Sequence, residues 1–160
     1  MSPQNWTVVV ADSKVVSPEE AQCLLARGYT YIDVRSEPEF GMGHPPGAFN
    51  VPLQRVEGDR LVDNLEFIAV MQQLFRTTDP LVIGCRSGAR SRRAIEQLEQ
   101  VGFGALAELQ HGFLGARDGF GRRLPGWMQA GLPVEQGDGA ARAYVCLLEC
   151  VRGESGARPR

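Results

Sequence analysis

The feature that most constrains the fold is a wholly apolar run at residues 81–84, Leu-Val-Ile-Gly. Asp79 and Pro80, which interrupt regular secondary structure, precede this run, and Cys85 follows it directly. A strand that is apolar at every position is typical of a sheet covered on both faces, as parallel sheets are. Residues 91–101 then place apolar side chains at helical spacing, and Gly102 ends that helix. This order of strand, loop and helix predicts an α/β fold.

The same alternation continues along the rest of the chain. A helix is expected to start with Ser17 as its N-cap and Pro18 at its first position, to bury Cys23 beside apolar neighbours, and to stop near Gly28. Residues rich in Pro and Gly indicate loops at 35–47 and 112–126. The other predicted strands are residues 6–11, 29–34, 48–52 and 106–109, and a helix capped by Asp63 or Asn64 is predicted to run to residue 75. Strands that alternate with helices favour a mainly parallel sheet.

Length and composition exclude several classes of protein. A chain of 160 residues indicates one domain, and a net charge of −2 disfavours binding to nucleic acid or to an anionic membrane. No apolar run reaches the roughly 18 residues of a membrane span, and the first residues do not resemble a secretion signal. We therefore expect a cytoplasmic protein. The four cysteines, at positions 23, 85, 146 and 150, are then expected to stay reduced, and no metal site or cofactor is predicted.

We divide the chain into an N-terminal extension at residues 1–14, a main domain at 15–135 and a C-terminal tail at 136–160. The tail is predicted to form one helix over residues 141–151. One face of this helix would carry Ala143, Cys146, Leu147, Cys150 and Val151. That face fits core packing, a homodimer contact, or a redox role for the two cysteines, and the sequence leaves these alternatives open.

Cys85 is the candidate for chemistry. In an open α/β sheet, ligands bind beyond the carboxyl ends of the strands, which is where the run at 81–84 delivers this cysteine. The loop that follows contains Gly88 and leads into a helix N-terminus, whose backbone N–H groups favour negative charge. Arg86 and Arg90 add full positive charges. These groups all favour the thiolate, so we expect Cys85 to be a nucleophile rather than a buried structural cysteine.

Several motifs in this order resemble the rhodanese-type sulfurtransferases. The loop Cys85-Arg86-Ser87-Gly88-Ala89-Arg90-Ser91 resembles the active-site loop of that family. Further matching motifs are Asp33-Val34-Arg35 with Glu37 and Glu39-Phe40, the segment Gly43 to Pro52, Gly112, Trp127, and Gly131-Leu132-Pro133-Val134. The resemblance covers roughly residues 15–135. It implies a small α/β domain with a five-stranded parallel sheet and helices on both faces.

The resemblance also implies a mechanism. The Cys85 thiolate would take the outer sulfur of a small anionic donor such as thiosulfate, form a persulfide, and pass the sulfur to cyanide or a thiol. Backbone amides of Arg86, Ser87, Gly88, Ala89 and Arg90 would hold the persulfide, and the two arginines would hold the donor. Asp33 and Arg35 lie at the same sheet edge, where they either form an internal ion pair or touch the substrate.

Other functions and roles stay open at this stage. Phosphatases and arsenate reductases related to this fold have five residues between cysteine and arginine, whereas four separate Cys85 from Arg90. A non-enzymatic sulfide-sensing module is a further alternative. His111 stands where the family usually has glycine, and it is either a surface residue or a group at the mouth of the site. The lengthened segment 113–126 fits a rim or lid.

Overall fold

The computed structural model of the 160-residue chain describes residues 14–137 and 139–153. Five strands form a sheet in the order β1-β7-β6-β2-β3, and every neighbouring pair is parallel. These strands are β1 Lys14–Val16, β2 Thr30–Asp33, β3 Phe49–Asn50, β6 Leu81–Gly84 and β7 Leu106–Leu109. The predicted α/β class and five-stranded parallel sheet are confirmed. The strand predicted at residues 6–11 lies outside the described residues.

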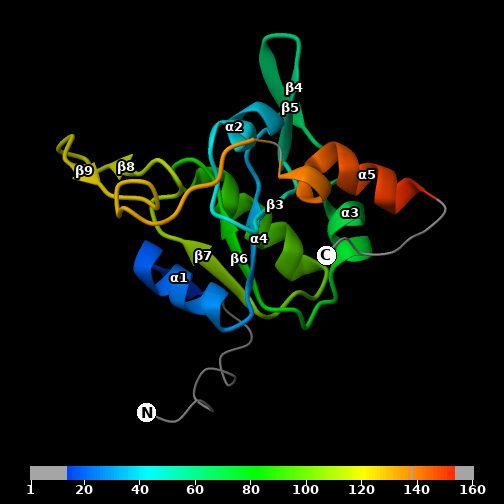
Figure 1. The fold of residues 1–160 in the computed structure, drawn as a ribbon, viewed down its shortest axis with the longest axis horizontal. Helices are drawn as coiled ribbons and strands as arrows, with labels where there is room; N and C mark the ends of the chain where they lie inside the picture. Colours follow the sequence, from blue (N-terminus) through cyan, green and yellow to red (C-terminus); the bar gives the residue numbers. More distant parts are fainter. Residues whose placement is uncertain (1–13, 138, 154–160) are drawn as a thin grey trace.

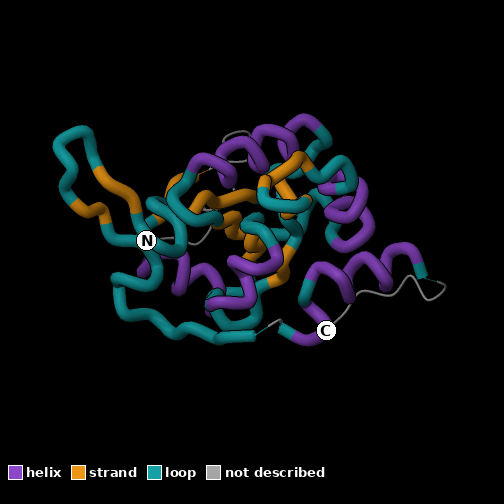
Figure 2. Tube along the Cα trace, turned by 90° about the horizontal axis from the view of Figure 1, so that it is seen from above, coloured by secondary structure: helices purple, strands orange, loops and turns teal. Residues whose placement is uncertain are grey.

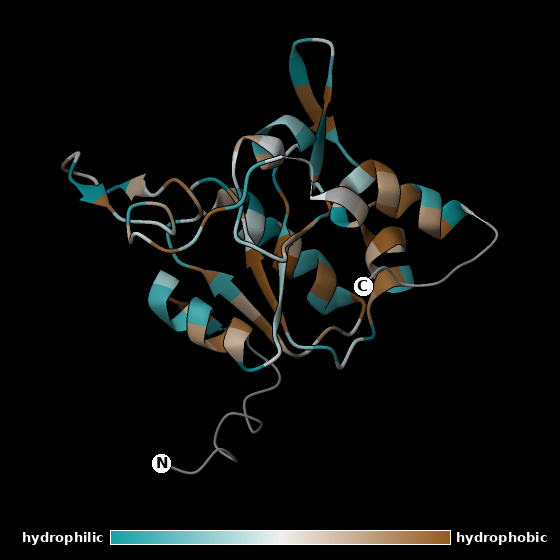
Figure 3. Ribbon diagram, viewed as in Figure 1, coloured by the Kyte–Doolittle hydropathy of each residue, from teal (hydrophilic) through white to brown (hydrophobic). Residues whose placement is uncertain are grey.

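Helices cover both faces of this sheet (Figure 2). They are α1 Pro18–Ala26, α2 Glu37–Met42, α3 Phe67–Leu74, α4 Ala89–Gln100 and α5 Tyr144–Arg152, with a 3-10 turn at Ala140–Arg142. Each face has its own cluster of buried apolar side chains, one including α3, α4 and α5 and the other including α1 and α2. All four residues of β6 are buried between these clusters, and Figure 3 shows this strand as hydrophobic. The two-sided cover explains why residues 81–84 are apolar at every position.

The N-terminal helix follows its predicted start. The side chain of Ser17 accepts a hydrogen bond from the backbone of Glu20, and the Glu20 carboxylate accepts one from the backbone of Ser17. The helix ends at Ala26, close to the predicted stop. The prediction that Cys23 is buried is wrong, because its side chain is exposed. Two residues advance about 200° around a helix, so Cys23 points away from the face on which Ala21 is buried.

The two segments interpreted as loops contain regular structure. Within 35–47, the short helix α2 forms because Ser36 donates its backbone N–H and its hydroxyl to the Glu39 carboxylate. The helix ends at Met42, and Gly43 caps it. Within 112–126, strands β8 Ala116–Arg117 and β9 Arg123–Leu124 form an antiparallel hairpin. A third unpredicted element is the hairpin of β4 Gln54–Glu57 and β5 Arg60–Asp63. Figure 1 shows both hairpins projecting from the sheet.

The C-terminal tail contributes to the core. Helix α5 lies beside α3 (Figure 1), and it buries Tyr144, Leu147 and Leu148. The Tyr144 hydroxyl also accepts a hydrogen bond from the Asn64 side chain at 2.9 Å. The buried face therefore differs from the predicted one, because Cys146 and Cys150 are only partly buried at its edges. Among the described residues, none of the helices is long and apolar enough to cross a membrane.

Candidate active site around Cys85

Cys85 lies where β6 ends, between β7 and β2, and so at the centre of the carboxyl edge of the sheet. Its side chain is buried, with 1% of its surface exposed. The sulfur accepts hydrogen bonds from the backbone N–H groups of Gly88 at 3.0 Å and of Ser91 at 3.3 Å. Gly88 has φ +126°, which side-chain-bearing residues rarely adopt, so the turn requires glycine here. Two amides and the start of α4 thus converge on one sulfur atom, an arrangement that favours its anionic form.

A buried carboxylate that the sequence did not reveal lies behind this sulfur. The Ser91 hydroxyl oxygen is 3.6 Å from the sulfur of Cys85 and 3.5 Å from a carboxylate oxygen of Glu108, on β7. Burial raises the pKa of Glu108, although Arg92 and Ser91 act in the opposite direction. The sequence predicted strand β7, but it did not predict which residues of β7 lie beside α4. That packing places Glu108 next to Ser91. Ser91 therefore links the sulfur to a carboxylate on a neighbouring strand.

Arg90 is engaged inside the protein. Its two terminal nitrogens donate to the two carboxylate oxygens of Glu39 at 2.7 and 2.9 Å. Burial alone would raise the pKa of Glu39, but hydrogen bonds from Arg90 and Ser36 outweigh burial and lower it to about 2. The expected role of Arg90 in donor binding stays a prediction. Its geometry favours a positioning role, because the ion pair ties the start of α4 to α2.

The outer residues of the loop face solvent. Arg86, Ser87 and Ala89 are exposed, and the first two line a surface cavity of about 650 Å³. The β8–β9 hairpin and Gln129 form the opposite wall of this cavity. The lengthened segment that we interpreted as a rim or lid thus lies beside the Cys85 loop. Of the two arginines expected to hold an anion, Arg86 faces the cavity.

Asp33 and Arg35 form a buried ion pair at the same sheet edge. The Arg35 guanidinium lies 2.6 Å from the Asp33 carboxylate, and it also donates to the carbonyl of Gly43 at 2.6 Å. The ring of Phe113 packs against the guanidinium, with 4.4 Å between its carbon and the ring centroid. These contacts join β2, the end of α2 and the segment after β7. Of the two roles left open by the sequence, the geometry favours the internal ion pair.

The turn at His111 and Gly112 packs directly on the Cys85 loop. Backbone N–H groups of Phe113 and Leu114 donate to the carbonyls of Cys85 and Arg86 at 2.7 and 3.0 Å. A Cβ atom at Gly112 would lie 2.5 Å from the carbonyl of Arg86, so only glycine fits. His111 is half-buried and adopts φ +63°, a conformation that glycine, the usual family residue here, adopts without strain.

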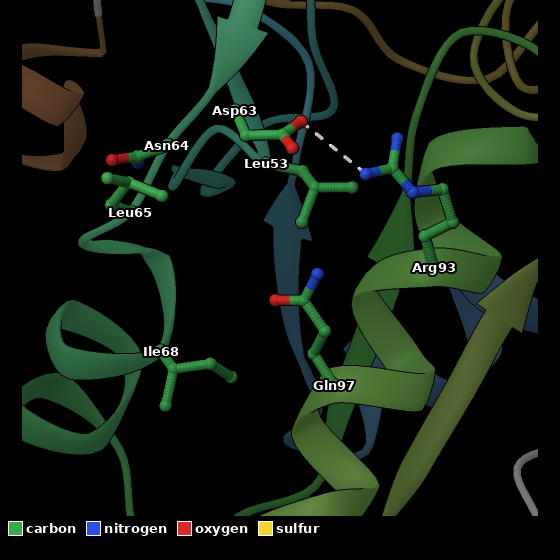
Figure 4. A pocket seen from close by; sticks show the side chains of 7 residues that line it. All are labelled: Leu53, Asp63, Asn64, Leu65, Ile68, Arg93 and Gln97. Carbon is green, nitrogen blue, oxygen red and sulfur yellow. Dashed lines mark hydrogen bonds and ion pairs between the residues drawn. The ribbon is translucent and has the colours of Figure 1, made fainter.

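A second cavity, of about 200 Å³, lies between α3, α4 and the end of β5 (Figure 4). The ion pair between Asp63 and Arg93, at 3.5 Å, spans it, and Ile68 and Gln97 face it from the two helices. It contains neither cysteine nor histidine. In the part of the chain that the structure describes, no cluster of three or more metal-ligating side chains occurs. The site around Cys85 is therefore the candidate for chemistry.

Comparison with known proteins identifies the family of the chain. The rhodanese-like domain family matches residues 17–117. The chain is 32% identical over 120 residues to thiosulfate sulfurtransferase 16, chloroplastic, of Arabidopsis thaliana, a match covering 75% of this chain and 91% of that protein. It is 35% identical over 116 residues to rhodanese-like domain-containing protein 15, chloroplastic, of the same plant, covering 72% of this chain and 58% of that relative. The chain thus spans less than two thirds of the latter protein.

The fold leads to the same family. The crystal structure of Rv0390 from M. tuberculosis matches with a TM-score of 0.66 at 28% identity, covering 78% of this chain and 98% of that one. The family match covers more than half of the chain, including β6, the Cys85 loop and α4. The resemblance inferred from the motifs is confirmed, and the chain belongs to the rhodanese-like domain family.

Proposed function

We propose that this protein transfers sulfane sulfur from a small anionic donor such as thiosulfate to a thiophilic acceptor, through a persulfide on Cys85. The observation that carries the proposal is the convergence of the Gly88 and Ser91 amides on the Cys85 sulfur at the start of α4. Relatives named thiosulfate sulfurtransferases support the same assignment.

The proposed reaction has two displacement steps. The Cys85 thiolate attacks the outer sulfur of thiosulfate, a new sulfur–sulfur bond forms, and sulfite leaves with the electron pair of the bond that breaks. An acceptor such as cyanide then attacks the outer sulfur of the persulfide. Thiocyanate is released, and the electron pair of the broken bond returns to Cys85 as a thiolate. The loop amides and the start of α4 stabilise negative charge at the sulfur before and after each step.

The length of the loop favours sulfur over phosphorus chemistry. Four residues separate Cys85 from Arg90, and the terminal nitrogens of Arg90 are already occupied by Glu39. A phosphoryl or arsenate group carries several oxygens and requires a wider ring of donors than a single sulfur. We therefore expect no efficient hydrolysis of aryl phosphates by this chain.

The test is a thiosulfate-to-cyanide assay with thiocyanate as the measured product. The native protein is expected to turn over, and Cys85→Ser is expected to abolish turnover because serine cannot form a persulfide. Cys146→Ser is the matched control, since that cysteine lies in α5 away from the loop and its loss should leave turnover intact. Turnover by Cys85→Ser, or efficient aryl phosphate hydrolysis by the native chain, would contradict the proposal.

A further inference from the structure

The β8–β9 hairpin places two arginines in an unfavourable position. Arg117 on β8 pairs directly with Arg123 on β9. Residues directly opposite in an antiparallel pair project from the same face, with Cβ atoms about 5 Å apart, and like charges there destabilise the hairpin. The structure therefore concentrates positive charge where hairpin stability alone would disfavour it. A negatively charged ligand between the two guanidinium groups would remove this repulsion.

Both arginines line the cavity beside the Cys85 loop, and Arg86 lines it from the loop side. No Asp or Glu is among the lining residues. Arg117 donates one hydrogen bond, to the carbonyl of Gly121 at 2.8 Å. Within residues 14–137 and 139–153, no carboxylate pairs with Arg86, Arg117 or Arg123. Three arginines thus line one cavity, and no carboxylate of the described residues lines it with them.

Arg122, in the same hairpin, differs from these arginines because it has a carboxylate partner. Its guanidinium pairs with the Asp118 carboxylate at 2.8 Å and lies over the ring of Phe120, and it does not line the cavity. Of the three hairpin arginines, the one that does not line the cavity therefore has a carboxylate partner, and the two that line it have none in the described part of the chain. Figure 1 places this hairpin at one end of the molecule.

The size and lining of the cavity indicate an organic ligand. Its volume of about 650 Å³ lies within the range of sites for organic small molecules and exceeds what cyanide or thiosulfate fills. Leu114, Leu124 and Pro125 supply apolar wall beside the arginines. Carboxylates match the planar fork of guanidinium groups, and a short carbon skeleton matches the apolar wall.

We propose that Arg117 and Arg123, together with Arg86, form a subsite that binds the carboxylates of an acidic thiol, the acceptor of sulfur from Cys85. This inference rests on the proposed function for the identity of the reaction. The hairpin is tied to the loop, because Leu114, at its base, donates its backbone N–H to the carbonyl of Arg86 at 3.0 Å. An acceptor held by the hairpin arginines therefore lies next to the loop that carries the persulfide. The subsite selects acceptors by their negative charge.

The kinetic test compares two acceptor thiols at fixed thiosulfate. Mercaptosuccinate carries two carboxylates, whereas 2-mercaptoethanol carries none. We expect the native protein to prefer mercaptosuccinate in kcat/KM by about tenfold or more at low salt, and added salt should reduce that preference. Arg117→Gln combined with Arg123→Gln should remove the preference. Arg122→Gln, which removes the same charge from the same hairpin, should retain it.

A binding measurement tests this inference independently of the proposed function. Succinate, which has the carboxylates but no sulfur, is titrated into the native chain and followed by the NMR signals of the arginine Nε–H groups. We expect succinate to bind the native chain and Arg122→Gln. Binding should be lost in Arg123→Gln and in the variant that combines Arg117→Gln with Arg123→Gln. This pattern supports the subsite even if no sulfur transfer is measured. No binding, unchanged binding in the double variant, or equal use of both thiols by the native protein would overturn it.

Discussion

The Cys85 loop and the β8–β9 hairpin face each other across one cavity, and they are built in opposite ways. In the loop, the sulfur, Ser91 and Arg90 all have partners within the protein, and Cys85 is buried. In the hairpin, Arg117 and Arg123 are exposed and directly opposed. Internal partners fix the geometry that a reaction needs, whereas unneutralised side chains remain available to a ligand. The difference is the one expected under our proposals, in which the loop performs chemistry and the hairpin selects the acceptor.

The sharpest way to test this contrast is to make the same small change in the turn that packs on the Cys85 loop and in the hairpin. Gly112→Ala should lower the free energy of unfolding by about 3 kcal/mol, because the new methyl group meets the Arg86 carbonyl and φ is +67°. Gly119→Ala, in the hairpin, meets no atom within 4 Å and should change stability by less than about 0.5 kcal/mol. Chemical denaturation of both variants measures the two effects. Equal effects would contradict the view that only the loop is tightly fixed.

The ion pairs of the two regions should also differ. Glu39→Gln should cost about 2 kcal/mol of stability at neutral pH, because Glu39 and Arg90 are mostly shielded from water. Arg122→Gln removes an exposed pair of the hairpin and should change stability little, since solvent screens it.

The Glu39 pair has a defined pH dependence. The pKa of the Glu39 carboxyl falls from 4.5 in the unfolded chain to about 2 in the folded protein. The stabilisation is therefore fully present above about pH 4.5 and is lost as the pH falls toward 2. The gap in unfolding free energy between the native protein and Glu39→Gln should narrow over that window. A gap that stays constant from pH 7 to pH 2 would refute the assignment.

The smallest expected effect concerns Glu108. Because burial raises its pKa, the ionised carboxylate destabilises the fold at neutral pH, and this cost disappears when the group is protonated in acid. Glu108→Gln should therefore stabilise the protein slightly at pH 7, and this gain should shrink as the pH falls. Denaturation curves at pH 7 and at lower pH test the sign. A variant less stable than the native protein at pH 7 would show that the carboxylate's contacts outweigh its burial.

The parts of the molecule that were predictable are those specified by local sequence. The apolar run at 81–84, the glycine of the loop and the helix after it predicted the setting of Cys85, and the capping residues of α1 predicted its start. Helix α2 was missed because Pro and Gly indicated a loop, whereas the contact between Ser36 and Glu39 starts a helix that these residues permit. The partners Glu39 and Glu108 were not predictable, since each meets the loop from a distant part of the chain. Arg117 and Arg123 were visible as charges, but only the strand register places them opposite one another.

The central claim is that Cys85 carries the sulfur. The most direct measurement is mass spectrometry of the native protein after treatment with thiosulfate and removal of excess reagent, followed by peptide mapping under conditions that preserve persulfides. The account predicts one added sulfur atom, located on the peptide that contains Cys85, and its release as thiocyanate when cyanide is added. An added sulfur on Cys23, Cys146 or Cys150 instead, or none on Cys85, would contradict the account.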